Sequence, residues 1–147
     1  MKLNKAGLDL IKSFEGLRLE TYKCSSGVNT IGYGTTLING KMVQNGLKIS
    51  LEDAERFLIE DIKKFELGVL RVVSVGLTDN QFSALLTFSY NVGLGALRGS
   101  TLLKMVNRNP NDPLIRNEFM KWNKAAGKEL TGLTRRRKAE ADLYFTK

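Results

Sequence analysis

Residues 14–43 read FEGLRLETYKCSSGVNTIGYGTTLINGKMV, and the change of pattern inside this stretch decides the fold. The apolar residues up to its start recur at helical spacing: Leu8, Ile11 and Phe14. This spacing predicts a helix with one apolar face. Asn4 can cap the start of that helix, and Gly16 is a natural stop. Glu15 is therefore expected at the helix end.

From residue 18 to residue 46 the composition shifts to frequent glycines with β-forming residues between them. Asn39-Gly40 lies inside this region and is typical of a two-residue hairpin with a type I′ turn. A neighbouring strand is predicted over residues 30–33. We therefore expect a small antiparallel sheet directly after the first helix.

Helical patterns fill the rest of the chain. Ser50 opens a helix with Asp53 in the capping-box position, and its apolar stripe is long enough to connect two lobes. Gly68 or Gly76 is expected to break or end this helix.

A second capping box, Thr78 with Gln81, precedes a nearly continuous apolar run. This run predicts a central, mostly buried helix that ends at Gly93. Further helices are expected over residues 101–107, from 112 to about 126, and from about 134 onward.

The sequence contains no histidine and a single cysteine, Cys24. Nucleophilic triads need an imidazole base and zinc sites need clusters of Cys and His, so neither class fits. One cysteine forms no internal disulfide. Carboxylate chemistry remains for catalysis, and no metal or cofactor is expected.

The formal net charge is +8, and the excess is concentrated toward the C-terminus. Residues 104–147 hold eleven basic and five acidic side chains, a net of +6. Such a surface suits a polyanion, either nucleic acid, anionic lipid or the bacterial wall. The apolar runs are too short to cross a bilayer, and the first residues do not resemble a secretory signal. We expect the protein to be made and folded in a cytoplasm.

Glu15 is the candidate catalytic acid. The negative end of a helix dipole disfavours ionisation, and apolar Phe14 and Leu17 beside it would act in the same direction. A carboxylic acid that stays protonated can donate a proton to a leaving oxygen, as in glycoside hydrolysis. From position alone, a solvated surface glutamate is the commoner explanation.

Several segments, taken together and in order, favour the catalytic explanation. Phe14-Glu15-Gly16-Leu17-Arg18, then Cys24, then Thr30-Ile31-Gly32-Tyr33-Gly34 resembles the active-site region of the phage T4-type lysozymes, the endolysins of glycoside hydrolase family 24. Later segments also resemble this family: residues 78–85, 88–93, 99–103, Trp122 with Gly127, and 132–137 with Glu140. The resemblance spans nearly the whole chain.

This resemblance implies that Glu15 is the general acid, that Cys24 replaces the usual Asp, and that Thr30 positions water. A free thiol is mostly protonated at neutral pH, so a neighbouring cation such as Lys23 would have to lower its pKa. Cys24 could then act as a base, a nucleophile or an electrostatic group. Without the motif, Cys24 is a small buried residue and Thr30 an ordinary strand residue.

Four further residues are implied to bind substrate or support the site: Gly32, Tyr33, Asn91 and Arg136. Each also has a purely structural explanation. Arg136 corresponds best to the family arginine that approaches the catalytic glutamate, with Arg135 and Arg137 as competitors. We expect at least two of these three arginines to lie on a solvated basic helix end.

The resemblance implies an α+β, lysozyme-like fold in one domain, residues 1–147. A sheet-containing lobe is expected at about 15–60, and a helical lobe at 1–14 and about 75–147. The implied function is that of an endolysin that lyses the host by hydrolysing the β-1,4 bond between N-acetylmuramic acid and N-acetylglucosamine in peptidoglycan. We expect a monomer that leaves the host cytoplasm after a separate protein opens the membrane.

Two other classes are considered. A nucleic-acid-binding module is suggested by the basic run at residues 135–138, but aromatic residues do not interleave with it, so no nucleic-acid partner is expected. A membrane-active protein is suggested by the same helix with Leu143 and Phe145. We expect at most a weak contact with anionic membranes there.

Overall fold

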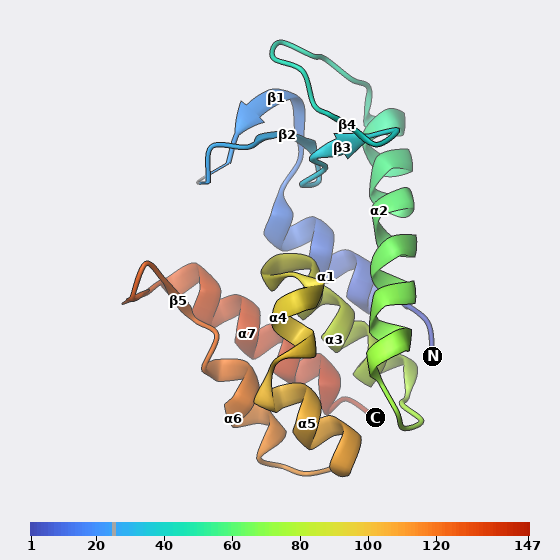
Figure 1. Cartoon of the computed structure of the whole chain (residues 1–147), viewed down its shortest axis with the longest axis vertical. Coiled ribbons are helices and arrows are strands. Elements are labelled where there is room, and N and C mark those ends of the chain that lie inside the picture. The colour runs from blue at the N-terminus through green and yellow to red at the C-terminus, as the bar shows by residue number, and fades with distance from the viewer. Residues whose placement is uncertain (25) are drawn as a thin grey trace. The chain divides into compact units, whose positions relative to one another are not determined.

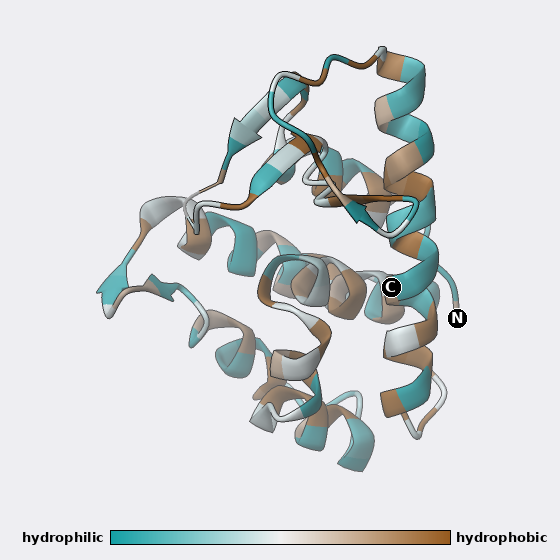
Figure 2. Cartoon of the chain, turned by 45° about the horizontal axis from the view of Figure 1, so that its top comes forward, coloured by the Kyte–Doolittle hydropathy of each residue, from teal (hydrophilic) through white to brown (hydrophobic). Residues whose placement is uncertain are grey.

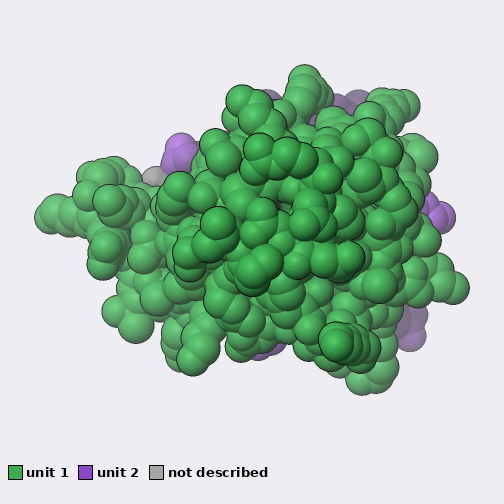
Figure 3. Space-filling model, turned by 90° about the horizontal axis from the view of Figure 1, so that it is seen from below, with its two compact units in different colours: residues 1–10, 65–147 green, residues 11–64 purple. Residues whose placement is uncertain are grey.

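The computed structural model describes residues 1–24 and 26–147 and divides into two compact units. Unit 2 is residues 11–64, and unit 1 combines residues 1–10 with residues 65–147 (Figure 3). Helices alternate with small antiparallel strand pairs, which confirms the predicted α+β class (Figure 1). Within the described residues, none of the helices combines the length and apolarity needed to span a membrane.

Helix α1 (Lys5–Glu15) begins and ends where its sequence predicts. The Asn4 side-chain oxygen accepts a hydrogen bond from the Gly7 backbone N–H at 3.0 Å, which caps the first turn. Gly16 has φ +69°, a left-handed conformation that glycine adopts without strain. Glu15 is therefore held as the last residue of the helix.

The strands of unit 2 form two separate pairs. Strand β1 (Arg18–Lys23) pairs with β2 (Asn29–Gly32), and β3 (Leu37–Ile38) pairs with β4 (Lys41–Met42). Positive φ angles of 52° at Asn39 and 78° at Gly40 confirm the predicted type I′ hairpin.

The prediction of one small sheet is therefore wrong, because these strands form two separate two-stranded sheets. The second edge of β1 is taken by the segment at residues 47–49: the Thr21 N–H donates to the Leu47 carbonyl, and the Ile49 N–H donates to the Leu19 carbonyl, both at 2.9 Å. The hairpin therefore has no free edge of β1 to join.

Helix α2 (Leu51–Val72) has the predicted capping box, because the Asp53 N–H donates to the Ser50 hydroxyl at 3.1 Å and the Ser50 N–H donates to the Asp53 carboxylate at 3.4 Å. Hydrophilic and hydrophobic residues alternate along it with helical periodicity (Figure 2). The helix continues through Gly68, where a Cβ atom would lie only 2.4 Å from Leu94 Cδ1. Close packing, rather than helix termination, explains this glycine.

Helix α3 (Asp79–Val92) is the buried centre of unit 1, as predicted. Its Thr78–Gln81 capping box is complete, and Gly93 with φ +98° ends it. Phe88 on α3 packs edge-on against Phe119 and Trp122, with ring centroids 5.7 and 5.4 Å apart. Helix α7 (Thr131–Tyr144) also packs against α3.

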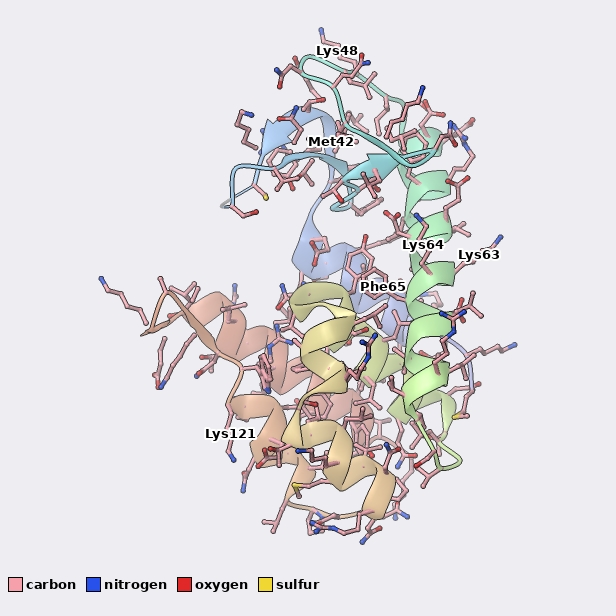
Figure 4. All side chains as sticks on the ribbon, in the orientation of Figure 1. Met42, Lys48, Lys63, Lys64, Phe65 and Lys121 are labelled. Atoms are coloured by element: carbon pink, nitrogen blue, oxygen red, sulfur yellow. The ribbon has the colours of Figure 1, made fainter. Side chains whose placement is uncertain are left out.

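Shorter elements complete unit 1: α4 (Leu94–Arg98), α5 (Thr101–Arg108), α6 (Ile115–Met120), β5 (Lys124–Ala125) and β6 (Lys128–Glu129). The helix expected to reach residue 126 ends at Met120, because Ala126 and Gly127 take φ angles of 52° and 79° and turn residues 124–129 into a hairpin. Near this end of α6, Lys121 extends outward and pairs with Glu118 at 2.7 Å (Figure 4).

Candidate active site

Glu15 is half-buried and stands at the C-terminal end of α1, three residues before β1 begins at residue 18. The charge of Glu15 acts on the phenol of Tyr22, which lies on β1. Burial, followed by the nearby charges of Glu15 and Cys24, raises the pKa of the Tyr22 phenol, and Arg18 acts against them. The guanidinium carbon of Arg18 lies 4.6 Å from the centroid of the Tyr22 ring. The phenol therefore lies within electrostatic reach of both Glu15 and Cys24.

The half-buried Cys24 thiol lies 2.9 Å from the Ser26 hydroxyl. Hydrogen bonds lower the pKa of Cys24 to about 7, first from the Ser26 side chain and then from backbone groups of Ser26 and Val28. Burial opposes this shift, and the Thr30 hydroxyl lowers the pKa by a smaller amount. The cation that we expected to be necessary is not the cause, since the Lys23 ammonium donates to Asn29 at 3.1 Å. Hydrogen-bond donors stabilise the thiolate instead.

Because only the thiolate is alkylated, iodoacetamide labelling of Cys24 should follow a titration with a midpoint near pH 7. An unperturbed cysteine would give a midpoint about 1.5 units higher. Mass spectrometry of the labelled chain across pH measures this curve. Ser26→Ala should move the midpoint upward, and a midpoint unchanged by that substitution would contradict the hydrogen-bond explanation.

Thr30 is buried and lies directly opposite Tyr22 in the β1–β2 ladder. Its hydroxyl donates to the Val28 carbonyl at 2.9 Å, which leaves the oxygen lone pairs as acceptors. Thr30 thus lies opposite Tyr22, and the charges of Glu15 and Cys24 act on the same phenol within unit 2.

Gly32 and Tyr33 both have structural roles in unit 2. Gly32 has φ +66°, and a Cβ atom there would lie 3.4 Å from the Ala54 Cβ, so α2 packs closely against this position. Tyr33 is buried, with the Lys12 ammonium 5.6 Å from its ring centroid. Contacts of either residue with a sugar stay predictions.

Asn91 and Arg136 belong to unit 1. Asn91 is exposed at the end of α3, and its side-chain oxygen accepts a hydrogen bond from Arg137. The buried Arg136 donates to the Glu140 carboxylate at 3.2 Å and to the Thr87 carbonyl at 3.0 Å. The roles of Asn91 and Arg136 toward substrate stay predictions.

The expectation that at least two of the three consecutive arginines are solvated is wrong. Arg135 is exposed, whereas Arg136 and Arg137 are buried. The reason is that α7 packs against α3, and Glu140, three and four residues later, faces the same side and forms an ion pair with each guanidinium group.

Two polar residues that the sequence analysis did not propose for the site lie in unit 2. Tyr22 could have been found, because it lies two positions before Cys24 in the stretch that resembles the family. Asp61 on α2 accepts a hydrogen bond from the Thr35 hydroxyl at 2.8 Å. No local sequence signal pairs Asp61 with Thr35, 26 residues away.

The titration of Asp61 should make the stability of the folded chain depend on pH. Burial raises its pKa, while the Thr35 hydrogen bond and Lys64 act against that rise. The folded state then binds the proton more tightly, so the contribution of Asp61 to stability is full below the unfolded pKa of 3.8 and is lost as pH rises through the folded pKa. Urea unfolding should therefore show the unsubstituted chain gaining stability relative to Asp61→Asn between about pH 7 and about pH 3. If the stability of the unsubstituted chain relative to Asp61→Asn fell as the pH was lowered, this prediction would be contradicted.

Unit 2 also carries an open groove along β1, with a volume of about 470 Å³. It begins two residues after Glu15 and is lined by Leu17, Arg18, Leu19, Glu20, Lys48 and Ile49. This mixture of both charge signs with leucines suits an extended polar ligand with apolar faces. Among residues 1–24 and 26–147, no three His, Cys, Asp or Glu side chains group as metal ligands.

Comparison with known proteins gives consistent matches. The phage lysozyme family model matches residues 12–140. The endolysin of Bacillus phage B103 is 46% identical over 148 residues, which cover 99% of this chain and 55% of that protein. The chain therefore spans about half the length of this relative.

Two solved structures are similar over nearly the full chain. The endolysin from Escherichia coli O157:H7 phage FAHEc1 has a TM-score of 0.89 and 43% identity, covering 99% of this chain and 94% of its own. The muramidase domain of SpmX from Asticaccaulis excentricus has a TM-score of 0.88 and 34% identity, covering 99% of both chains. With the family model matching residues 12–140 and these relatives covering almost all of it, the chain belongs to the phage lysozyme family.

Proposed function

We propose that this chain is an endolysin, a glycoside hydrolase that cleaves the β-1,4 bond between N-acetylmuramic acid and N-acetylglucosamine in bacterial peptidoglycan. Relatives named as endolysins and a similar muramidase domain support this class over a nucleic-acid-binding or membrane-active module. The observation that carries the proposal is that Thr30 lies opposite Tyr22 in the β1–β2 pair, with Cys24 directly after β1 and Glu15 at the end of the helix before it. Glycoside hydrolysis usually uses two carboxyl groups, one as general acid and the other as base or nucleophile. Glu15 supplies the first, and the readily ionised Cys24 thiol is proposed in place of the second.

In this proposal Glu15 is the general acid. Protonation of the glycosidic oxygen by its carboxyl group lets the bond break, while positive charge develops on the departing sugar carbon. The position of Glu15 as the last residue of α1, directly before the turn into β1, fixes the backbone that carries this carboxyl group.

Cys24 is proposed as the group that replaces the usual carboxylate. With a pKa of about 7, a large part of the thiol is ionised at neutral pH, so it supplies a negative charge without an aspartate. Thr30 is proposed to hold the hydrolytic water through its hydroxyl oxygen, which can accept a hydrogen bond while the hydroxyl donates to Val28. These groups act together on a sugar bound beside β1.

Product analysis tests the proposed bond. Purified peptidoglycan digested by the protein should gain reducing sugar ends at N-acetylmuramic acid, without new free amino groups from cleaved peptides. Borohydride reduction followed by acid hydrolysis and sugar analysis identifies the new end. Release of amino groups, or reducing ends at N-acetylglucosamine alone, would overturn the proposal.

A substitution series tests the role of Cys24. Cys24→Asp should keep activity if the position needs only an anionic or basic group, whereas Cys24→Ser should lose most of it because a hydroxyl does not ionise at neutral pH. Turbidity loss of permeabilised cells measures both. A fully active Cys24→Ala protein would remove Cys24 from the mechanism.

We further propose that the protein accumulates in the host cytoplasm and reaches the wall after a separate protein has opened the membrane. Expression should then leave cells intact until a permeabilising agent is added, and lysis should follow at once. Lysis without any permeabilising agent or partner protein would contradict this route.

A further inference from the structure

The backbone directly after Thr30 folds into a tight turn. Ile31 and Thr35 exchange two backbone hydrogen bonds, each 2.9 Å long. Gly32 and Gly34 take φ angles of +66° and +93°, which close the turn. The position of this turn therefore determines where the end of β2, and with it Thr30, is held.

The turn is attached to α2 by a polar contact at its last residue. The Thr35 hydroxyl, on a residue with 0% exposure, donates to Asp61 Oδ2 at 2.8 Å. Hydrogen bonds to a carboxylate are about twice as strong as those between neutral groups. Because Thr35 is buried, loss of this acceptor would leave its hydroxyl without a partner.

Asp61 occupies a position where the helical pattern calls for an apolar residue. It lies seven residues after Ala54 and three after Leu58, both of which are buried on the core-facing side of α2. A half-buried carboxylate is unfavourable at such a position unless it has a specific partner. The charged groups that influence it on α2 are Lys64 and Glu60, both of which are exposed; Lys63 and Lys64 extend from this helix in Figure 4.

Helix α2 thus supports the turn at two points two helical turns apart. Ala54 packs against Gly32 at the start of the turn, and Asp61 holds Thr35 at its end. The first contact is apolar and allows sliding, whereas the second is directional and fixes the register of the turn. A 22-residue helix with a capping box is a rigid base for both contacts.

We propose that Asp61 is a positioning residue of the site described above: through the Thr35 hydroxyl it fixes the turn that carries Thr30, and so holds the Thr30 hydroxyl opposite Tyr22 and beside Cys24. This inference rests on the proposed glycosidase function. Asp61 itself touches neither substrate nor reacting groups. Its effect is geometric, since a displacement of about 1 Å in a water-holding group can lower a rate about a hundredfold.

Thr35→Val and Asp61→Ala test the contact, because valine keeps the shape of threonine without its hydroxyl and alanine removes the acceptor. Release of reducing ends from solubilised peptidoglycan should give kcat values about tenfold or more below that of the unsubstituted chain, with KM within about twofold. The double variant should lose no more than either single variant, because both remove one interaction.

Conservative variants separate positioning from packing. Thr35→Ser keeps the hydroxyl but removes a buried methyl group, so it should retain kcat even though it lowers the urea midpoint. Asp61→Asn keeps an acceptor oxygen and should be more active than Asp61→Ala. Lys63→Ala, on an exposed residue of α2 that does not act on Asp61, is the matched control and should leave kcat unchanged.

Two results would overturn the inference: kcat within about twofold of the unsubstituted chain in both Thr35→Val and Asp61→Ala, or an equal loss of kcat in Thr35→Ser and Thr35→Val. If the unsubstituted chain releases no reducing ends, the proposed function fails instead. The inference is then still tested by backbone amide hydrogen exchange, in which the Ile31 N–H, which donates to the Thr35 carbonyl, should exchange faster in Thr35→Val than in the unsubstituted chain. An unchanged exchange rate at Ile31 would contradict it.

Discussion

Glu15→Gln is expected to lower the rate of peptidoglycan hydrolysis by about 10²- to 10⁴-fold, the usual contribution of general acid catalysis. Glutamine keeps the size of the side chain and its hydrogen-bonding capacity, but it has no acidic proton for the leaving oxygen. The substitution lies at a half-buried helix end, so the fold should be retained. Release of reducing ends from purified peptidoglycan measures the rate.

Asp9→Asn is the matched control for this experiment. Asp9 lies on the same helix and makes an exposed ion pair with Lys5 at 2.9 Å, which contributes little to stability. Its variant should hydrolyse peptidoglycan at the unsubstituted rate. If Glu15→Gln kept more than about one-tenth of the activity, Glu15 would not be the general acid.

Glu140→Ala is expected to destabilise the chain by about 3–5 kcal/mol, the usual consequence of removing one partner from a buried ion pair. Glu140 has 0% exposure and accepts hydrogen bonds from Arg136 at 3.2 Å and from Arg137 at 2.5 Å. Without this carboxylate, two guanidinium groups stay buried in unit 1 with no negative charge from Glu140. The urea midpoint and its slope measure the loss.

An exposed ion pair on the same helix provides the comparison. Asp142 accepts a hydrogen bond from Arg116 at 2.7 Å, and both side chains are about half exposed, at 55% and 41%. Asp142→Ala should therefore cost only about 0–1 kcal/mol. Equal losses in Glu140→Ala and Asp142→Ala would show that burial of the triad adds nothing to its strength.

Much of the candidate site could be predicted because its three central residues lie in one short stretch. Glu15 follows from a helix that ends at Gly16, and Thr30 follows from a glycine-bounded strand. The residues that tune the site could not be predicted in the same way. The Ser26 hydroxyl lies 2.9 Å from the Cys24 thiol, and the Cys24 N–H donates to the Val28 carbonyl at 3.0 Å, contacts that no helix or strand pattern predicts.

The sequence by itself determined the features that depend on residues within about four positions of each other. These are the caps at Asn4, Ser50 and Thr78, and the type I′ turn at Asn39-Gly40. Each rests on a backbone hydrogen bond or a φ angle that a few neighbouring side chains decide.

Only the tertiary structure decided which polar groups are buried and what neutralises them. Arg136 and Arg137 resemble a solvated basic run, yet both are buried, and Glu140 forms an ion pair with each of them. Asp61 accepts a hydrogen bond from Thr35, which is 26 residues away in the chain. Gly68 is explained by its close packing against Leu94 rather than by a helix end. The physical reason is that burial and long-range pairing depend on which surfaces meet after folding, and no local pattern in the chain encodes that.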